Sequence, residues 1–94
     1  MIRVLAILLV STGLLYADDQ PEARKLFRIG ASAYKENRFD AAAANFDRAW
    51  ELYKAAEIAF SAAQAHRLQY QADQSPEHLE RAIVMFEAYV AAVP

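Results

Sequence analysis

The chain has 94 residues, a formal net charge of −2 and no cysteine. This length gives room for one small domain, and the lack of cysteine excludes disulfides as a means of stabilising it. No run of like charge exceeds two residues, so the sequence offers no clustered basic face and we do not expect nucleic acid as a partner.

The first expected element is a bacterial-type secretory signal peptide over residues 1–17. A single arginine precedes the apolar stretch Val4–Leu15, and the small residue Ala17 stands before the acidic Asp18. The apolar stretch has 12 residues, whereas a membrane-spanning helix needs roughly 20. We therefore expect an exported protein, periplasmic or secreted, that begins at about Asp18. The alternative is an uncleaved membrane anchor formed by residues 4–17.

Four helices are expected in residues 18–94, because alanine is abundant there and glycine and proline are rare. No segment alternates apolar and polar residues for long enough to predict a strand. The expected helices run from about 21 to 36, from 40 to about 54, from about 55–57 to 68–70 and from 76 onward, with residues 71–75 as a polar loop. Pro21 and Pro76 suit the first turn of a helix. Asp40 and Ser75 suit N-caps, and Asn37 suits a left-handed helix end.

Apolar and small residues recur at helical spacing on these segments and define the expected core. Residues expected to pack between helices are Leu26, Gly30, Ala42, Phe46, Ala49, Phe60, Ala63, Ala82 and Phe86. Ile29 shares the stripe of Leu26. In the last helix, Leu79, Ile83 and Val90 are expected to point inward with Ala82 and Phe86. Trp50 is expected in the seam between the two helix pairs, and the alternative is a partly exposed position on the outer surface.

Two parts of the chain repeat each other. Leu26, Ile29 and Tyr34 recur as Phe60, Ala63 and Leu68, 34 residues later, and Phe39, Ala42 and Phe46 recur as Leu79, Ala82 and Phe86 after the polar loop. The motif Leu26-x-x-Ile29-Gly30-x-x-Ala33-Tyr34-Lys35, followed by Arg38-Phe39-Asp40-x-Ala42-x-x-x-Phe46-x-x-Ala49, resembles a tetratricopeptide repeat (TPR).

The TPR resemblance implies an all-α fold of two antiparallel helix hairpins, with repeat 1 over about 22–54 and repeat 2 over about 55–94. Their four helices would form a short right-handed solenoid, preceded by the signal-peptide helix. A plain four-helix bundle would explain the helical periodicity. It would not explain why small and aromatic residues return in the same order.

The resemblance also implies a function, because members of this family hold a segment of another protein in a concave groove. The residues expected to line that groove are Arg24, Phe27, Ala31, Tyr34, Lys35, Ile58, Ser61, Ala65 and Leu68. Some members clamp a terminal carboxylate with Lys and Asn side chains, but the matching positions here hold Phe27, Ala31 and Ala65. The expected groove is apolar with a basic flank, and it suits a segment with hydrophobic anchors and some acidic residues.

No residues predict catalysis, a cofactor or a metal site. His66 and His78 lie twelve residues apart on different expected helices, without the paired spacing of metal ligands. The sequence contains no Gly-rich phosphate loop, no Gly-x-Ser-x-Gly motif and no HExxH motif. We therefore expect a non-catalytic interaction module.

Two alternatives to this function remain. The first is a structural protein that associates with itself through the last helix, since Ile83, Phe86 and Val90 cannot all be covered by the preceding helices and an open apolar patch is typical of an interface. The second is the exported helical part of a larger enzyme or sensor, which the end of the sequence at Pro94 leaves open.

Overall fold

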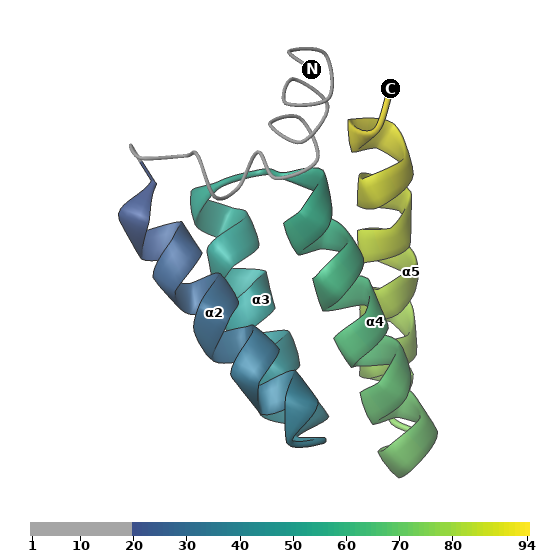
Figure 1. The fold of residues 1–94 in the computed structure, drawn as a ribbon. Helices are drawn as coiled ribbons and strands as arrows, with labels where there is room; N and C mark the ends of the chain where they lie inside the picture. Colours follow the sequence, from purple (N-terminus) through teal and green to yellow (C-terminus); the bar gives the residue numbers. More distant parts are fainter. Residues whose placement is uncertain (1–19) are drawn as a thin grey trace, which may run out of the picture.

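The computed structural model describes residues 20–94 (Figure 1), and the expected signal peptide lies outside them. This part of the chain consists of four α-helices without a strand, which confirms the all-α prediction. The helices are α2 (Pro21–Lys35), α3 (Phe39–Leu52), α4 (Ala56–Asp73) and α5 (Pro76–Ala92).

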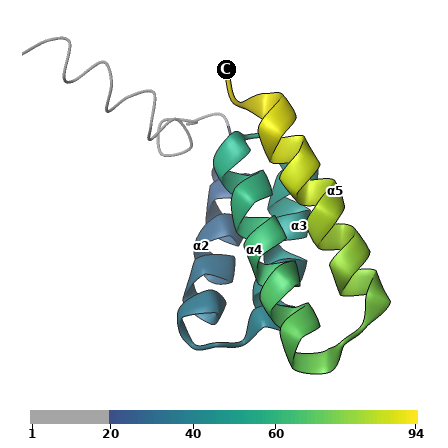
Figure 2. The same cartoon turned by 90° about the vertical axis from the view of Figure 1, so that its right-hand side faces the viewer.

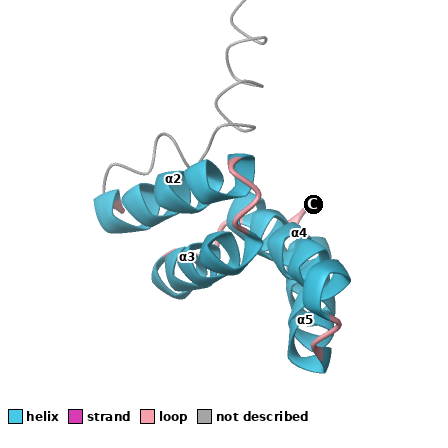
Figure 3. Ribbon diagram, turned by 90° about the horizontal axis from the view of Figure 1, so that it is seen from below, coloured by secondary structure: helices cyan, strands magenta, loops and turns pink. Residues whose placement is uncertain are grey.

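The four helices form two hairpins that stand side by side. Each helix packs chiefly against its neighbours in the sequence: α2 against α3, α3 against α4, and α4 against α5. In Figure 1, α2 and α4 lie toward the viewer, and α3 and α5 lie behind them. Figure 2 shows the α4–α5 hairpin in front. In Figure 3, which views the helices from below, α2 and α5 lie on opposite sides of the arrangement. The arrangement therefore leaves one side of α2 and one side of α5 without a helical neighbour in the described residues.

The turn between α2 and α3 is a tight C-terminal cap centred on Asn37. Asn37 has a φ of 62°, which confirms the left-handed helix end predicted for it. Its N–H donates to the carbonyl of Tyr34 at 3.0 Å, and the N–H of Arg38 donates to the carbonyl of Ala33 at 2.9 Å. These two bonds are the pair that defines a Schellman motif. They fix the direction in which α3 leaves α2.

The predicted loop 71–75 is wrong for most of its length. Residues 71–73 continue α4, and only Gln74 and Ser75 connect α4 to α5. The side-chain amide of Gln69 donates to the carboxylate of Asp73 at 3.0 Å across one helical turn, and Gln74 ends the helix with a φ of 59°. Polar residues at an exposed helix end can thus be helical, so their polarity alone did not indicate a loop.

The two predicted N-caps also differ from the structure. Helix α3 begins at Phe39 with Arg38 at the cap position. Asp40 lies inside the first turn, where its carboxylate accepts a hydrogen bond from the N–H of Ala41 at 2.7 Å. Ser75 does hold the cap position of α5, but its hydroxyl makes no capping hydrogen bond to the described residues. At both starts an acidic residue in the first turn, Asp40 or Glu77, complements the helix dipole instead.

Alanine dominates the core. The buried alanines that form its largest cluster are Ala33, Ala42, Ala43, Ala59, Ala62, Ala63 and Ala65. Small side chains allow the helix backbones to approach closely. The closest approach is at Gly30, where a Cβ would lie 2.7 Å from the ring of Phe46. Phe46 itself is only 2 % exposed, so its ring fills the space that Gly30 leaves.

A second, smaller cluster is formed by Leu26, Ala49 and Ile58. Trp50 packs against both clusters, as expected for a residue in the seam between the hairpins. Its ring also lies 5.4 Å from the ammonium group of Lys54. Phe27 packs against both clusters as well, so the two clusters are joined through two half-buried aromatic side chains.

Several residues assigned to the core lie at the surface. Phe60 is 41 % exposed and Ile29 is similarly exposed, while Phe86 is half-buried. In α5, Leu79, Ile83 and Val90 are exposed, and the buried residues are Ala82 and Met85. The reason is that α5 packs chiefly on α4, so that only one side of α5 is covered by the described residues.

Candidate functional site

A hollow of about 270 Å³ lies between α2 and α4, the two helices that lie toward the viewer in Figure 1. Its lining residues are Phe27, Ala31, Tyr34 and Lys35 from α2, Phe46 from α3, and Phe60, Ser61 and Gln64 from α4. All but three of them are apolar or aromatic. The hollow thus offers an apolar wall with one cation, Lys35, at the end of α2.

The sequence of α2 explains why these residues face the hollow. Ala23, Leu26, Gly30 and Ala33 take the buried side of the helix. Phe27, Ala31 and Tyr34 follow the next stripe at spacings of four and three residues, so they share a face. That face borders the core without being covered by it.

Neighbouring rings hold the aromatic side chains of α2 in place. The ring of Phe27 lies 5.3 Å from that of Phe46, and the ring of Tyr34 lies edge-on to Phe39 at 5.3 Å. Such pairs are attractive beyond the apolar area they bury. Phe27 and Tyr34 are therefore ordered before any ligand arrives, which lowers the entropic cost of binding.

A second hollow, of about 660 Å³, lies between the start of α4 and the end of α5. It is lined by Ala56, Glu57, Phe60, Ser61, Tyr89, Ala92, Val93 and Pro94. Phe60 and Ser61 line both hollows. The two hollows therefore adjoin at these residues and are referred to below together as the α4 groove, with Lys35 of α2 beside one hollow and Glu57 of α4 beside the other.

Phe60 stands at the centre of the α4 groove. Its ring contacts Phe86 edge-on at 6.1 Å and Tyr89 at 5.2 Å. The repeat predicts a core position for Phe60, because Phe60 corresponds to Leu26, which is also predicted to pack between helices. In α4, however, Ala59, Ala62 and Ala63 occupy the core, and the ring of Phe60 is left at the surface.

The structure brings together five of the nine residues expected in the groove: Phe27, Ala31, Tyr34, Lys35 and Ser61. Ile58 and Ala65 were expected to line it, and this is wrong because both are fully buried. Ile58 packs on Leu26 and Ala49, and Ala65 lies in the main core cluster. Arg24 and Leu68 are half-buried outside both hollows.

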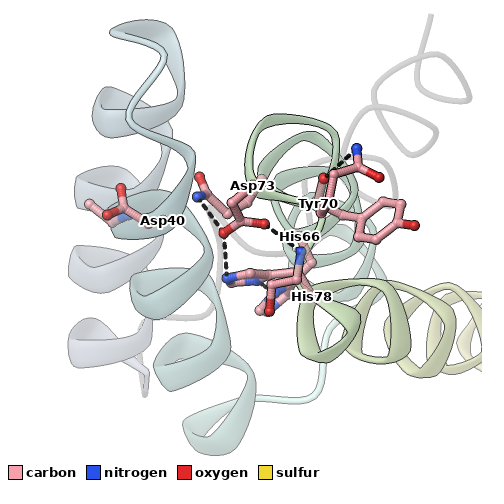
Figure 4. A network of polar contacts seen from close by, with 9 residues as sticks. Asp40, His66, Tyr70, Asp73 and His78 are labelled. Carbon is pink, nitrogen blue, oxygen red and sulfur yellow. Dashed lines mark hydrogen bonds and ion pairs between the residues drawn. The ribbon is translucent and has the colours of Figure 1, made fainter.

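The two histidines form a polar cluster that the sequence did not predict (Figure 4). Their Nδ1 atoms lie 3.0 Å apart, and the Nε2 of His66 lies 2.9 Å from a carboxylate oxygen of Asp47. The same oxygen lies 3.6 Å from the Nε of Arg81. Asp47 belongs to α3, His66 to α4, and His78 and Arg81 to α5. This histidine cluster thus connects three helices.

Proton positions in the histidine cluster follow from its geometry. A carboxylate only accepts hydrogen bonds. The Nε2 of His66 therefore carries a proton and donates a hydrogen bond to Asp47. Between the facing Nδ1 atoms, one must donate and the other accept. This hydrogen bond therefore requires that one of the two Nδ1 atoms carries a proton and the other does not. The Nε2 of His78 lies 3.8 Å from the carboxylate of Asp73.

Asp73 has a lowered pKa in this arrangement. The main cause is the hydrogen bond from the side chain of Gln69, followed by the bond from the N–H of Ser75, with a smaller electrostatic contribution from His78. All three stabilise the charged carboxylate. Within residues 20–94, no group of three or more His, Cys, Asp and Glu side chains is arranged to hold a metal ion.

No protein-family model matches the chain, and neither the curated proteins nor the solved structures contain a significant match to it. Among the described helices, none is both long and apolar enough to cross a membrane. The site is therefore interpreted from its own geometry.

Proposed function

We propose that this chain is an exported, non-catalytic protein–protein interaction module that holds a segment of another protein in the α4 groove. The observation that carries the proposal is the aromatic wall of that groove, in which Phe27, Tyr34 and Tyr89 are half-buried and Phe60 is exposed. Aromatic side chains in partly enclosed sites are the residues that contribute most to binding energy at protein interfaces. Phe60 is exposed, although burying its ring in the core would stabilise the fold. Such exposure is expected for a residue that a partner covers.

The chemistry of the α4 groove suggests what it binds. An apolar side chain of the partner would enter beside Phe27, Tyr34 and Phe60, and an acidic residue would pair with Lys35 at the end of α2. Glu57 beside the other hollow would repel an acid and favour a basic or polar residue. The ligand is thus a short segment with hydrophobic anchors and an asymmetric charge distribution.

We further propose that the two hairpins are TPR-like repeats, over about 22–54 and 55–94, arranged as a short right-handed solenoid. The contact between Gly30 and Phe46 and the burial of Ala42 and Ala49 support this, because the motif places small residues where the helices approach each other. The position of the smaller hollow also supports it, since it lies between α2 and α4, which are the first helices of the two hairpins.

Export is proposed from residues 1–17. The protein isolated from its native host should begin at or within a few residues of Asp18, as intact-mass analysis would show. Retention of Met1 on membrane-bound material would instead indicate an anchor.

The binding proposal is tested with peptides selected from a displayed random library against the purified protein. Tyr34→Ala and Phe60→Ala should each weaken a selected peptide by about 1–2 kcal/mol, which is roughly tenfold in Kd. Leu52→Ala is the matched control for Phe60→Ala, because Leu52 is exposed to a similar extent but lies on α3 and lines neither hollow. Unchanged affinity in both groove variants, with both still folded, would contradict the proposal.

A further inference from the structure

One side of α5 carries a line of exposed apolar residues, the α5 stripe, which consists of Leu79, Ile83, Phe86 and Val90. Leu79, Ile83 and Val90 are 40 %, 51 % and 69 % exposed, and Phe86 is half-buried. A hollow of about 340 Å³ opens on the stripe, lined by Phe86, Glu87, Val90 and Ala91. A contiguous apolar surface of this kind on a soluble domain marks an interaction site.

The spacing of the residues in the α5 stripe indicates that its partner is a helix. Its residues follow one another at intervals of four, three and four, which is the a/d alternation of a coiled-coil heptad. This spacing keeps apolar side chains facing a second helix that runs alongside. Ala82 and Met85 on the adjacent side of α5 are already buried. The stripe is therefore separate from the surface by which α5 packs on α4.

Acidic residues flank the α5 stripe on its outer edge. Glu80 and Glu87 both are exposed and lie seven residues apart, so they occupy the same heptad position in successive repeats. Each directly follows a stripe residue, Leu79 or Phe86. At this position side chains of paired helices meet across the seam, and their charges determine which partner is accepted. On the opposite edge the equivalent residues are Ala82 and Tyr89, which pack toward α4.

We propose that the α5 stripe docks an amphipathic helix of a separate protein, whose apolar seam is flanked by Lys or Arg residues that pair with Glu80 and Glu87. The stripe lies on α5, whereas Phe27 and Tyr34 of the aromatic wall lie on α2. The inference therefore does not depend on the function of the α4 groove. With both surfaces in use, the module joins two partners.

A second copy of this chain fits the stripe less well. If two copies paired antiparallel, with Ile83 against Phe86 of the other copy, Glu80 would lie beside Glu87 of the other copy. Like charges facing each other across a seam are destabilising. In a parallel pairing, the positions opposite Glu80 and Glu87 are Ser75 and Ala82, which supply no cation. The charges beside the α5 stripe therefore favour a basic helix over self-association.

The test uses two synthetic probe peptides of about three heptads, with Leu at positions a and d. One carries Lys at the flanking e and g positions, and the other carries Glu there. Because like charges repel, neither peptide pairs with itself. Kd is measured by fluorescence anisotropy with the purified protein. The Lys peptide should bind about tenfold more tightly than the Glu peptide, and Glu80→Lys/Glu87→Lys should reverse that preference.

Matched variants locate the binding site. Ile83→Ser should weaken the Lys peptide at least tenfold, whereas Val84→Ser should not, because Val84 is equally exposed on the same helix but lies off the stripe. Glu51→Lys/Glu77→Lys makes the same charge change away from the stripe and should leave the preference intact. Tyr34→Ala should also leave it intact, which separates this surface from the α4 groove.

The proposal is overturned if the Lys peptide does not bind, if the two peptides bind equally, or if Ile83→Ser and Val84→Ser behave alike. It is also overturned if sedimentation equilibrium without peptide shows a dimer that Ile83→Ser dissociates, because the occupant of the stripe would then be a second copy.

Discussion

Gly30→Ala tests the closest helix contact in the fold. A Cβ at position 30 would lie 2.7 Å from two ring atoms of Phe46, whereas carbon atoms in contact prefer about 3.5–4.0 Å. The ring cannot retreat freely, because Phe46 is buried against Phe27. Overpacking of this kind lowers the free energy of unfolding by about 1–3 kcal/mol. The better helix propensity of alanine offsets about 0.8–1.0 kcal/mol of this loss. The expected net effect is a loss of about 1 kcal/mol in the free energy of unfolding.

Urea denaturation of four proteins measures this effect: the wild type, both single variants and the double variant Gly30→Ala/Phe46→Leu. Leucine at position 46 lacks the ring atoms that meet the new methyl group. In that background Gly30→Ala should become neutral or stabilising, by up to about 1 kcal/mol, because only the propensity gain remains. If Gly30→Ala stabilises the wild type by that amount, Phe46 does not lie against Gly30 and the packing of α2 on α3 is refuted.

Three further changes test other parts of the fold. Ala42→Leu, at a fully buried site, should lower the free energy of unfolding by about 1–3 kcal/mol, and an unchanged melting temperature would mean that α3 does not pack as described. His78→Ala removes the partner of the buried Nδ1 of His66 and should cost about 1–3 kcal/mol; a neutral result in urea denaturation would show that the ring pair contributes nothing to joining α4 and α5. Because the pKa of Asp73 is lowered, its carboxylate stabilises the fold above the ordinary aspartate value of about 4, and this contribution is lost as the pH falls through the lowered pKa. The urea midpoint of Asp73→Asn should therefore change less than that of the wild type when the pH falls below about 4, and identical pH profiles would contradict this.

The helices could be predicted from the sequence because their signals are local. Pro21 and Pro76 open α2 and α5, and Asn37 closes α2, as their backbone preferences require. The burial of Ala42 and Ala49 followed from spacing alone. The end of α4 was missed because its polar residues stabilise one another within the helix, through the bond from Gln69 to Asp73.

The candidate site was harder to predict, because it depends on how the helices rotate against one another. The repeat offset assigned Phe60 to the core and Ile58 to the groove, and the structure reverses both. An α4 rich in alanine offers many small residues that can form a core, so sequence spacing does not decide which side turns inward. The contact of His66 with His78 could not be predicted either, since it requires the packing of α5 on α4.

Chemical-shift mapping by NMR tests directly whether the α4 groove binds a protein segment. A library-selected peptide is titrated into isotope-labelled protein and the backbone amide signals are followed. The largest shifts should fall on four residues that line the hollow between α2 and α4: Ala31, Tyr34, Ser61 and Gln64. Shifts confined to α3, or to the histidine cluster, with these four signals unmoved would contradict binding in the α4 groove.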